Sequence, residues 1–287
     1  MKKPSVMQME VTIQNQSEQL NQSRLLYGKV AVIFGAGGAT GSQVAREFAK
    51  EGATVFLSGR HLSSVESVAE EIRTSKGKAQ AAEVDALKER VVNAYLDSVV
   101  KQAGGIDIVF NAVGPQPIEF DNGKSTMELS YEKFLIPMNT YVASNFLTAR
   151  AAARHMVPRH SGVILFITAT PSSGIAPHIS AIGAAMGALE AMMRCFAAEW
   201  SPSGVRVVGV RSAGMHDTRT IHQTFENMGR TIGLTREQFA EQVKLQTLLK
   251  RMPVVDDTAK IAAFLASDRA NTITGGIVNS TCGQVID

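Results

Sequence analysis

Short apolar segments alternate with amphipathic segments along most of this chain of 287 residues. Apolar runs of about four to eight residues between turn signals are typical of buried strands, and apolar residues at helical spacing indicate helices between them. Strands that are apolar throughout are buried on both faces, as in a parallel sheet covered by helices. Because crossovers are right-handed, the pattern predicts an α/β fold with a doubly wound parallel sheet. The predicted strands are Lys29–Phe34, Ala53–Ser58, Ala79–Val84, Ile106–Phe110, Val163–Thr168, Val205–Val210 and Gly276–Asn279.

The segments between these strands predict helices that cover both faces of the sheet. Pro137 interrupts the longest of them, since proline lacks the N–H that a helix interior needs. No linker rich in Pro, Gly or Ser divides residues 28–287, so we predict one domain there. Residues 215–252 are polar and mixed, which indicates short helices in a mobile segment. The predicted helices are 42–50, 63–72, 91–100, 130–157, 180–200 and 259–265.

Residues 1–27 differ from the rest of the chain, with five Gln, two Asn and three Ser among them. This polar bias is typical of a flexible N-terminal extension. An arm that reaches a neighbouring subunit is the alternative, and nothing in the sequence selects it. No continuous apolar stretch follows the two lysines after Met1, so we do not expect a secretory signal.

Charge and cysteine content exclude several classes of protein. The net charge of +3 comes from 29 basic and 26 acidic residues, which is too balanced for a nucleic-acid-binding surface. No apolar run reaches the roughly 18 residues of a membrane span. Cys195 and Cys282 form neither a disulfide framework nor a Cys-x-x-Cys metal site. We therefore expect a cytoplasmic protein without a metal, a membrane partner or a nucleic-acid partner.

A glycine cluster separates the first predicted strand from the first helix. Gly35 allows a sharp turn, and Gly41 allows the helix to pack closely on its strand. A glycine between them lets backbone N–H groups approach a diphosphate, to which the helix N-terminus adds partial positive charge. The spacing predicts a dinucleotide on this turn. The predicted ligands are Gly35, Gly37, Gly38, Thr40 and Gly41.

The second predicted strand ends in Ser58, Gly59 and Arg60. An NAD site usually has a carboxylate here, which binds the ribose hydroxyls. A guanidinium suits the 2′-phosphate of NADP, because the contact is a charge-assisted hydrogen bond. We therefore predict NADP(H), with Ser58 and Arg60 as its ligands.

These motifs and others further along resemble the short-chain dehydrogenase/reductase family over about residues 28–287. Phe34–Gly41 is similar to the family's Thr-Gly-x-x-x-Gly/Ala-x-Gly turn, and Asn111–Gly114 is similar to its Asn-Asn-Ala-Gly turn. Gly183–Ala191 with Ser212–Gly214 looks most like the enoyl-ACP-reductase branch. The resemblance implies a Rossmann-type sheet, a small-molecule substrate and a homotetramer or dimer joined through the helices over 130–157 and 180–200. It also implies that the cofactor contacts include Asp85, Asn111, Ala112, Gly114, Met186 and Gly214.

The two residues on which the family's chemistry depends are missing. Members donate a proton from a tyrosine, and a lysine four residues later lowers the pKa of that tyrosine and holds the nicotinamide ribose. Alignment on the Gly187–Glu190 stretch puts Met186 at the lysine and Ile182 at the tyrosine, or Ile179 by the enoyl-reductase spacing. Because neither Ile nor Met can donate a proton, the usual mechanism is not available.

Other side chains are therefore candidates for the reaction. His178 precedes the helix over 180–200, and an imidazole can donate a proton, so we predict it as a substitute acid. Thr168 and Thr170 flank the position of the family's serine and are predicted to hydrogen-bond a carbonyl. Asn139 falls at the family's relay asparagine, and Tyr141 is expected on another side of that helix.

Three functions remain open at this point. The first is an NADP(H)-dependent oxidoreductase that acts on a carbonyl or enone, with residues 215–250 as a lid. The second is a catalytically degenerate protein that binds a nucleotide or serves as a scaffold. The third is a non-redox lyase or isomerase on the same frame, since sites rather than folds determine chemistry.

Overall fold

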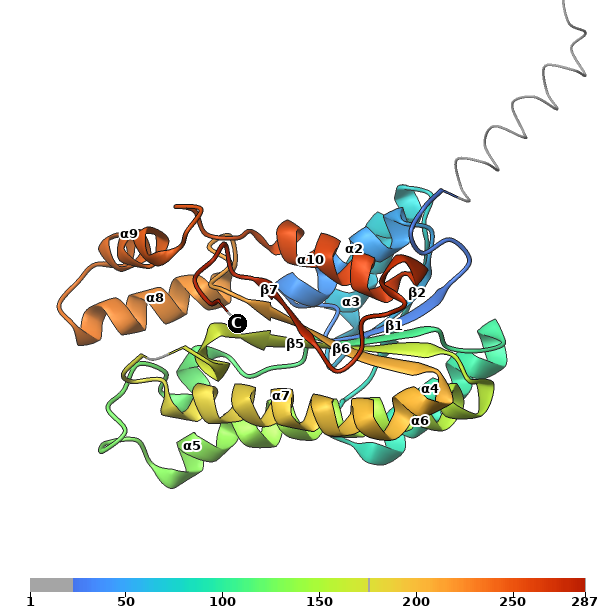
Figure 1. Ribbon diagram of the computed structural model, residues 1–287, viewed down its shortest axis with the longest axis horizontal. Coiled ribbons are helices and arrows are strands. Elements are labelled where there is room, and N and C mark those ends of the chain that lie inside the picture. Colours follow the sequence, from blue (N-terminus) through green and yellow to red (C-terminus); the bar gives the residue numbers. More distant parts are fainter. Residues whose placement is uncertain (1–22, 175, 287) are drawn as a thin grey trace, which may run out of the picture.

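The computed structural model describes residues 23–174 and 176–286, and its centre is a seven-stranded parallel sheet (Figure 1). The strand order is β3-β2-β1-β4-β5-β6-β7, and each neighbouring pair is parallel. The predicted fold class is thereby confirmed, and every predicted strand is present within one or two residues of its expected bounds. The strands are β1 Val30–Phe34, β2 Thr54–Gly59, β3 Lys78–Glu83, β4 Ile108–Asn111, β5 Gly162–Ala169, β6 Val205–Ser212 and β7 Ile277–Ser280.

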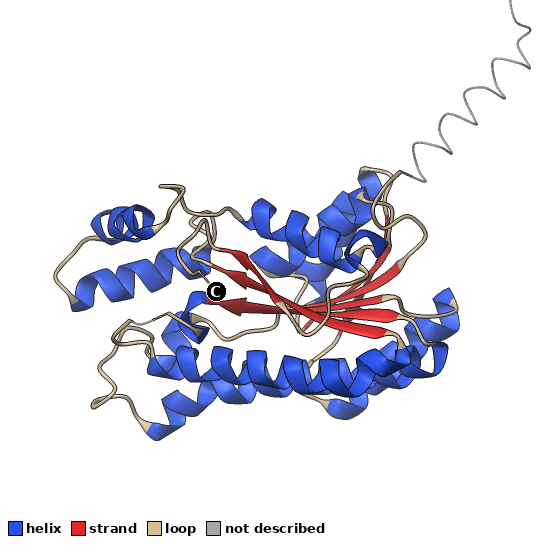
Figure 2. Cartoon of the chain, in the orientation of Figure 1, coloured by secondary structure: helices blue, strands red, loops and turns tan. Residues whose placement is uncertain are grey.

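Helices cover both faces of the sheet, as Figure 2 shows. One buried cluster joins the sheet to α2, α3 and α10, and a second joins its other face to α4, α6 and α7. The strand order reverses between β1 and β4, so the carboxyl ends of these strands border a crevice where ligands bind in such sheets. The helices are α2 Ala39–Lys50, α3 Leu62–Thr74, α4 Glu89–Ala103, α6 Ala143–Met156, α7 Ser180–Trp200 and α10 Val255–Ala266.

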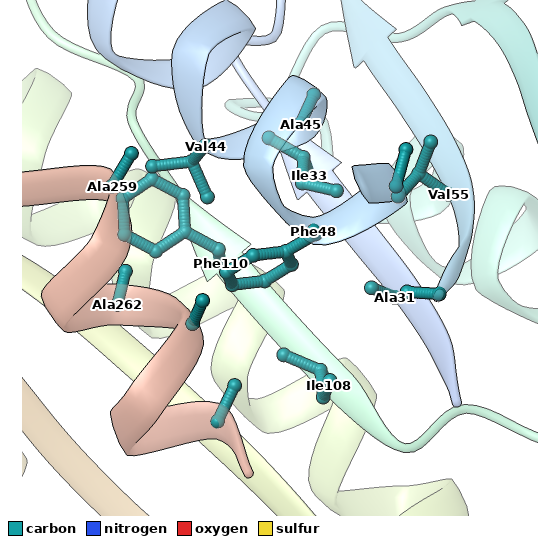
Figure 3. Close-up of a cluster of buried hydrophobic side chains, with 14 of the residues drawn as sticks. Ala31, Ile33, Val44, Ala45, Phe48, Val55, Ile108, Phe110, Ala259 and Ala262 are labelled. Carbon is teal, nitrogen blue, oxygen red and sulfur yellow. The ribbon is translucent and has the colours of Figure 1, made fainter. Parts of the chain in front are cut away.

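Aromatic and small side chains lock α2 and α10 onto the sheet (Figure 3). Phe48 of α2 and Phe110 of β4 are fully buried, and Ala262 of α10 packs in the same cluster. Burial of one such Phe side chain contributes roughly 1.5–3 kcal/mol. This packing fixes the N-terminus of α2 beside the end of β1, where the cofactor site is predicted.

The long helix predicted over 130–157 is broken into three parts. α5 (Tyr131–Pro137) ends at the proline that the sequence marks as an interruption, and a π-helical turn η2 (Met138–Val142) joins it to α6. Because π-helical turns are rare and often lie at functional sites, η2 marks this region for closer study.

Residues 215–252 form two ordered helices, α8 (Arg219–Thr231) and α9 (Arg236–Gln246). Their N-termini are capped by the side chains of Thr218 and Thr235. Each cap satisfies backbone N–H groups that the first turn of a helix leaves free.

The end of the predicted N-terminal extension is docked rather than free. Leu26 is fully buried, and its backbone N–H donates to the carbonyl of Glu51. Residues 1–22 of that predicted extension lie outside the described residues.

The stretch Ser180–Ser203, which includes α7, is long and apolar enough to cross a membrane. In the structure α7 packs as a core helix, since Ala185, Leu189 and Met193 are fully buried on the sheet side. The prediction that no apolar run reaches the length of a membrane span was therefore wrong for this segment. Packing against the sheet explains its apolar character.

Candidate cofactor site and reaction site

The glycine turn after β1 is closely packed against the turn after β4. Gly35 has a φ of +74°, and a Cβ on it would lie 2.9 Å from the carbonyl carbon and oxygen of Ala112. A Cβ on Gly41 would collide with the carbonyl oxygen of Gly35. Glycine is therefore required at both positions, as predicted from the sequence, and the backbone comes within reach of a ligand there.

The N-terminus of α2 is open in a way that suits an anion. Gly38 is the N-cap and supplies no side-chain cap, and the first turn, which contains Thr40, has no acidic residue. Gly37 and Gly38 are exposed. The free N–H groups and the helix dipole at this point fit a diphosphate, whereas α8 and α9 satisfy such groups with threonine caps.

The end of β2 separates the two predicted NADP ligands. Ser58 is fully buried, and its Oγ donates to the carbonyl of Ile33 at 3.3 Å, so its hydroxyl lies inside the sheet. Arg60 is exposed, and within the described parts of the chain it has no hydrogen bond or ion pair. The N-terminus of α3 follows directly at Leu62. The structure therefore leaves a free guanidinium beside a helix N-terminus.

The predicted cofactor contacts Asp85 and Asn111 stabilise their own turns by hydrogen bonds. Asn111 is buried, and its amide donates to Thr148 Oγ1 at 2.9 Å while its Oδ1 accepts from the N–H of Val113 at 2.8 Å. Asp85 accepts from the N–H of Leu87 at 3.0 Å. Both side chains thus shape the loops after β3 and β4, which present backbone to the crevice.

The positions predicted to align with the family's tyrosine (Ile182, or Ile179) and lysine (Met186) carry apolar side chains. Met186 is buried, and the half-buried Ile182 packs against the same cluster. Val113, Tyr141 and Ala169 are also partly buried against that cluster. This part of the site therefore has an apolar floor with one phenol.

Tyr141 is the residue of η2 that reaches the site. A Cβ on Gly114 would lie 2.7 Å from the Tyr141 hydroxyl oxygen, so the ring lies directly on the turn after β4. Burial, with the charge of Glu119 nearby, raises the pKa of Tyr141 to about 12. Asn139, the predicted relay residue, is exposed on the same turn, so the two side chains lie on different sides of it, as predicted. The sequence reasoning selected Asn139 for the site and therefore did not select Tyr141.

His178 occupies an unusual position before α7. Its φ is +63°, which a residue with a Cβ rarely adopts and which is often found at functional sites. Its Nδ1 is buried, and no partner for it lies among the described residues. Its carbonyl accepts from the N–H of Gly123 at 3.1 Å.

A buried ion pair supports the turn after β5. Arg211 of β6 and Glu190 of α7 are almost fully buried, with Nη2 and Oε2 2.9 Å apart. Thr168 Oγ1 donates to Glu190 at 3.0 Å, and Arg211 Nε donates to Ser172 at 3.0 Å. Burial disfavours the charge of Glu190, but hydrogen bonds from Arg211, Ser172 and Thr168 prevail and lower the pKa of that carboxyl.

The two predicted threonines, Thr168 and Thr170, both lie beside this ion pair. Thr168 is buried and bonded to Glu190, whereas the half-buried Thr170 begins the short helix η4 (Thr170–Ser172) that Arg211 anchors. The sequence signal for the pairing of Glu190 with Arg211 was only that each charge lies in a largely apolar segment. Charges of this kind must be paired when buried.

α8 lies over the carboxyl end of β6. A Cβ on Gly214 would lie 2.8 Å from the ring of Phe225, so the two segments are in contact. Thr231 Oγ1 donates to the carbonyl of Gly123 at 2.8 Å. α8 therefore bridges from the predicted cofactor contact Gly214 to the loop that follows β4.

Within residues 23–174 and 176–286, no three His, Cys, Asp or Glu side chains form a group that could hold a metal ion.

The sequence matches the family described as Enoyl-(Acyl carrier protein) reductase over residues 35–284. An uncharacterised oxidoreductase of Methylorubrum extorquens is 29% identical over 259 residues, which are 90% of this chain and 98% of that protein. Gluconate 5-dehydrogenase of Gluconobacter oxydans is 27% identical over 256 residues, 88% of this chain and 93% of that protein. The structure of NAD+-bound xylitol dehydrogenase superposes with a TM-score of 0.83 at 23% identity, covering 90% of this chain and 99% of that one.

Proposed function

The chain belongs to the enoyl-(acyl carrier protein) reductase family of short-chain dehydrogenases/reductases, and from this premise we propose an NADP(H)-dependent oxidoreductase that acts on a carbonyl or enone. Members of this family are oxidoreductases, and a nicotinamide cofactor goes with the family. The preference for NADP(H), the substrate class and the altered proton donor are the proposed parts.

The observation that carries the proposal is the pair of anion sites at the carboxyl edge of the sheet. The uncapped first turn of α2 offers backbone N–H groups to the diphosphate, with Gly35, Gly37, Gly38, Thr40 and Gly41 around it. Arg60, unpaired beside the N-terminus of α3, supports a 2′-phosphate contact. No carboxylate stands at the end of β2, so this strand offers no hydrogen-bond acceptor to the ribose hydroxyls of NAD.

The bound nicotinamide would supply or accept a hydride at the substrate carbon. The chain must then give a proton to, or hydrogen-bond, the oxygen that becomes negative. Ile182 and Met186 can do neither. His178, with its unpartnered Nδ1, is the proposed donor, and the neutral phenol of Tyr141 is the rival group. Thr170 is proposed as a second hydrogen-bonding group, while Thr168 would act through Glu190.

Calorimetric titration with NADP+ and NAD+ tests the cofactor. We expect tighter binding of NADP+, and Arg60→Ala should weaken it about tenfold or more while leaving NAD+ unchanged. Arg90→Ala, an exposed arginine of α4, is the matched control. Equal affinity of the wild type for the two nucleotides would refute the NADP preference.

Oxidation of NADPH with a panel of ketones and enones tests the reaction. Turnover that is undiminished in His178→Ala would remove His178 from the mechanism, and Tyr141→Phe then becomes the decisive variant. Tight NADP+ binding with no turnover would favour the second candidate, a nucleotide-binding protein without chemistry. The apolar side chains at 182 and 186 are the observation that favours this alternative.

We also propose a cytoplasmic homo-oligomer joined through α6 and α7. Phe146 of α6 is 38% exposed, and Ala184, Ala191 and Cys195 of α7 are exposed. Small side chains along α7 suit close packing between copies. Light scattering after size exclusion would give the mass, and a monomer at micromolar concentration would contradict this proposal.

A further inference from the structure

Three segments that are far apart in the sequence meet at Gly123. The N–H of Gly123 donates to the carbonyl of His178 at 3.1 Å, and its carbonyl accepts from Thr231 Oγ1 of α8 at 2.8 Å. Its α-carbon lies so close to Asn227 that a Cβ would be 3.2 Å from the Asn227 carbonyl carbon. The loop after β4, the loop before α7 and α8 therefore form one junction, which we call the Gly123 junction.

Buried polar atoms without partners lie on residues of this junction and on the adjoining helix α8. The described residues contain five such side-chain atoms, and three of them are Asn122 Oδ1, His178 Nδ1 and Gln223 Oε1. Asn122 is adjacent to Gly123 and is only 9% exposed. Buried polar groups are nearly always hydrogen-bonded, so these unpaired atoms point to a partner from outside the protein.

Helical spacing places Gln223 on the face of α8 that turns to the junction. Gln223, Asn227 and Thr231 are four residues apart, and residues with this spacing share one face of a helix. Asn227 and Thr231 both contact Gly123, so Gln223 continues their row by one turn. The turn that contains Gln223 is the one nearer to Gly214, because Ile221 and Phe225 pack against Gly214. The row therefore runs from Gly123 toward the cofactor end of the site.

The chemistry of these atoms identifies the kind of molecule that would satisfy them. Amide oxygens only accept hydrogen bonds, so Asn122 and Gln223 need donors. Lys124 and Lys133 each lie 3.9 Å from Asp121, and Glu119, whose carbonyl accepts from Lys133, adds a second carboxylate, so the charges next to the junction balance. A neutral molecule that carries several hydroxyl groups fits both conditions.

We infer that the Gly123 junction is a binding site for the hydroxyl groups of a neutral polyol or polyhydroxy ketone, held by Asn122 and Gln223. The inference deepens the proposed function by naming the class of substrate. It rests on the proposed function in one respect only, namely that another part of the bound polyol or ketone reacts. Binding at the junction does not depend on the proton donor. Apolar ketones and enones would lack these contacts and bind more weakly.

Calorimetry with three pentitols (ribitol, xylitol and arabitol) tests the site, with 1,5-pentanediol as the analogue that lacks the inner hydroxyls. The full chain is titrated with and without saturating NADP+. We expect at least one pentitol to bind about tenfold tighter than the diol. Asn122→Leu and Gln223→Met should each reduce that preference several-fold. Gln102→Met, an exposed glutamine of α4, should leave it unchanged.

Thermal unfolding of the same variants separates a ligand-binding amide from a structural one. Removal of an unpartnered buried polar atom should keep or raise Tm, whereas loss of a structural hydrogen bond lowers it. The inference is overturned if no pentitol binds better than the diol, if the preference survives both substitutions, or if both variants lose Tm without losing affinity. Because the two residues lie on separate elements, misfolding of one variant still leaves the other as a test.

The outcomes also distinguish this inference from the proposed function. Pentitol binding that is lost in the variants, in a protein that binds no nucleotide, would support the junction and refute the oxidoreductase proposal. NADP+ binding and turnover of simple ketones without any pentitol preference would refute the junction alone.

Discussion

The nucleotide half and the reaction half of the crevice obtain their polar groups in different ways. Around the glycine turn the groups are backbone N–H donors, made accessible because Gly35 and Gly41 have no Cβ. Around α7 the family relies on side chains, and here Ile182 and Met186 occupy those positions. Backbone donors do not change when side chains are replaced. On the proposed function, the glycine turn binds the nucleotide without the side chains that the family uses for proton donation.

The reaction half nevertheless has its own polar framework, one layer behind the apolar surface. Glu190 and Arg211 are buried next to Thr168 and Ser172, and they tie α7 to β6 and η4. If the two halves truly differ, substitutions in this framework should affect stability, while substitutions in the glycine turn should affect nucleotide affinity. The predictions below test that division.

The largest expected effect is that of Arg211→Met. It leaves the Glu190 carboxylate buried without its counter-charge, which should destabilise the fold by about 3–5 kcal/mol in urea unfolding at pH 7. Arg230→Met removes the exposed partner of Glu226 and should cost less than about 1 kcal/mol. An equal loss of unfolding free energy in the two variants would show that the buried pair does not stabilise the fold more than an exposed pair does.

Acid titration of stability gives the same pair a second test. Because the pKa of Glu190 is lowered in the folded state, its contribution is complete above the ordinary carboxyl value of 4.5. It should be lost as the pH falls through the lower folded value. The wild type should therefore lose stability faster than Glu190→Gln in this acidic window, as unfolding midpoints at several pH values would show.

Gly41→Ala should have the next largest effect, now in the nucleotide half. Its new Cβ meets the Gly35 carbonyl, so the turn must open and the affinity for NADP+ should fall about a hundredfold. Gly187→Ala in α7 is the matched control, since nothing lies within 4 Å of the added Cβ. That control should gain roughly 0.5–1 kcal/mol of stability. Undiminished calorimetric affinity in Gly41→Ala would refute the diphosphate site.

The sequence predicted the nucleotide half better than the reaction half, and the reason is local. Gly35 and Gly41 are required by turns that their own neighbours form, so their spacing is visible in the chain. Glu190 and Arg211 become partners only through packing between α7 and β6. Such a pair has no sequence pattern beyond a charge where apolar residues surround it.

Tyr141 illustrates a different gap in sequence reasoning. It was predicted on another side of its helix from Asn139, and the structure agrees, because Asn139 is exposed while the Tyr141 ring lies against Gly114. Resemblance to the family selected Asn139 for the site, so the residue that contacts the turn after β4 was passed over. Seven strands and most helices, by contrast, follow from apolar runs and spacing, because burial on a sheet repeats regularly along the chain.

Tyr141→Phe should have a smaller effect, and it asks whether the reaction half keeps a working phenol. If the phenol of Tyr141, rather than His178, donates the proton, kcat/KM for NADPH-dependent reduction should fall about tenfold, with little change in stability at pH 8. Tyr131→Phe, at an exposed tyrosine of α5, should leave activity unchanged. An unaltered kcat/KM in Tyr141→Phe would leave His178 as the remaining donor.

Alkaline pH distinguishes the phenol further. Since the folded pKa of Tyr141 is about 12, above the ordinary value of 10.0, folding favours the neutral phenol. Its contribution to stability is complete below pH 10 and is lost as the pH rises toward 12. Urea midpoints measured between pH 8 and pH 10.5 should therefore fall more in the wild type than in Tyr141→Phe.

The smallest expected effect is that of Ser58→Ala, which sharpens the description of the nucleotide half. The sequence predicts Ser58 as an NADP ligand because it ends an apolar run, but β2 continues to Gly59 and keeps Ser58 within the sheet. Its Oγ is buried and bonded to the Ile33 carbonyl, so it cannot face a phosphate without leaving that bond. The affinity for NADP+ should change less than about twofold, against about tenfold in Arg60→Ala. Loss of the hydrogen bond should cost about 1 kcal/mol in unfolding. A tenfold loss of NADP+ affinity in Ser58→Ala would mean that the end of β2 rearranges when nucleotide binds, and that side chains as well as backbone define this half.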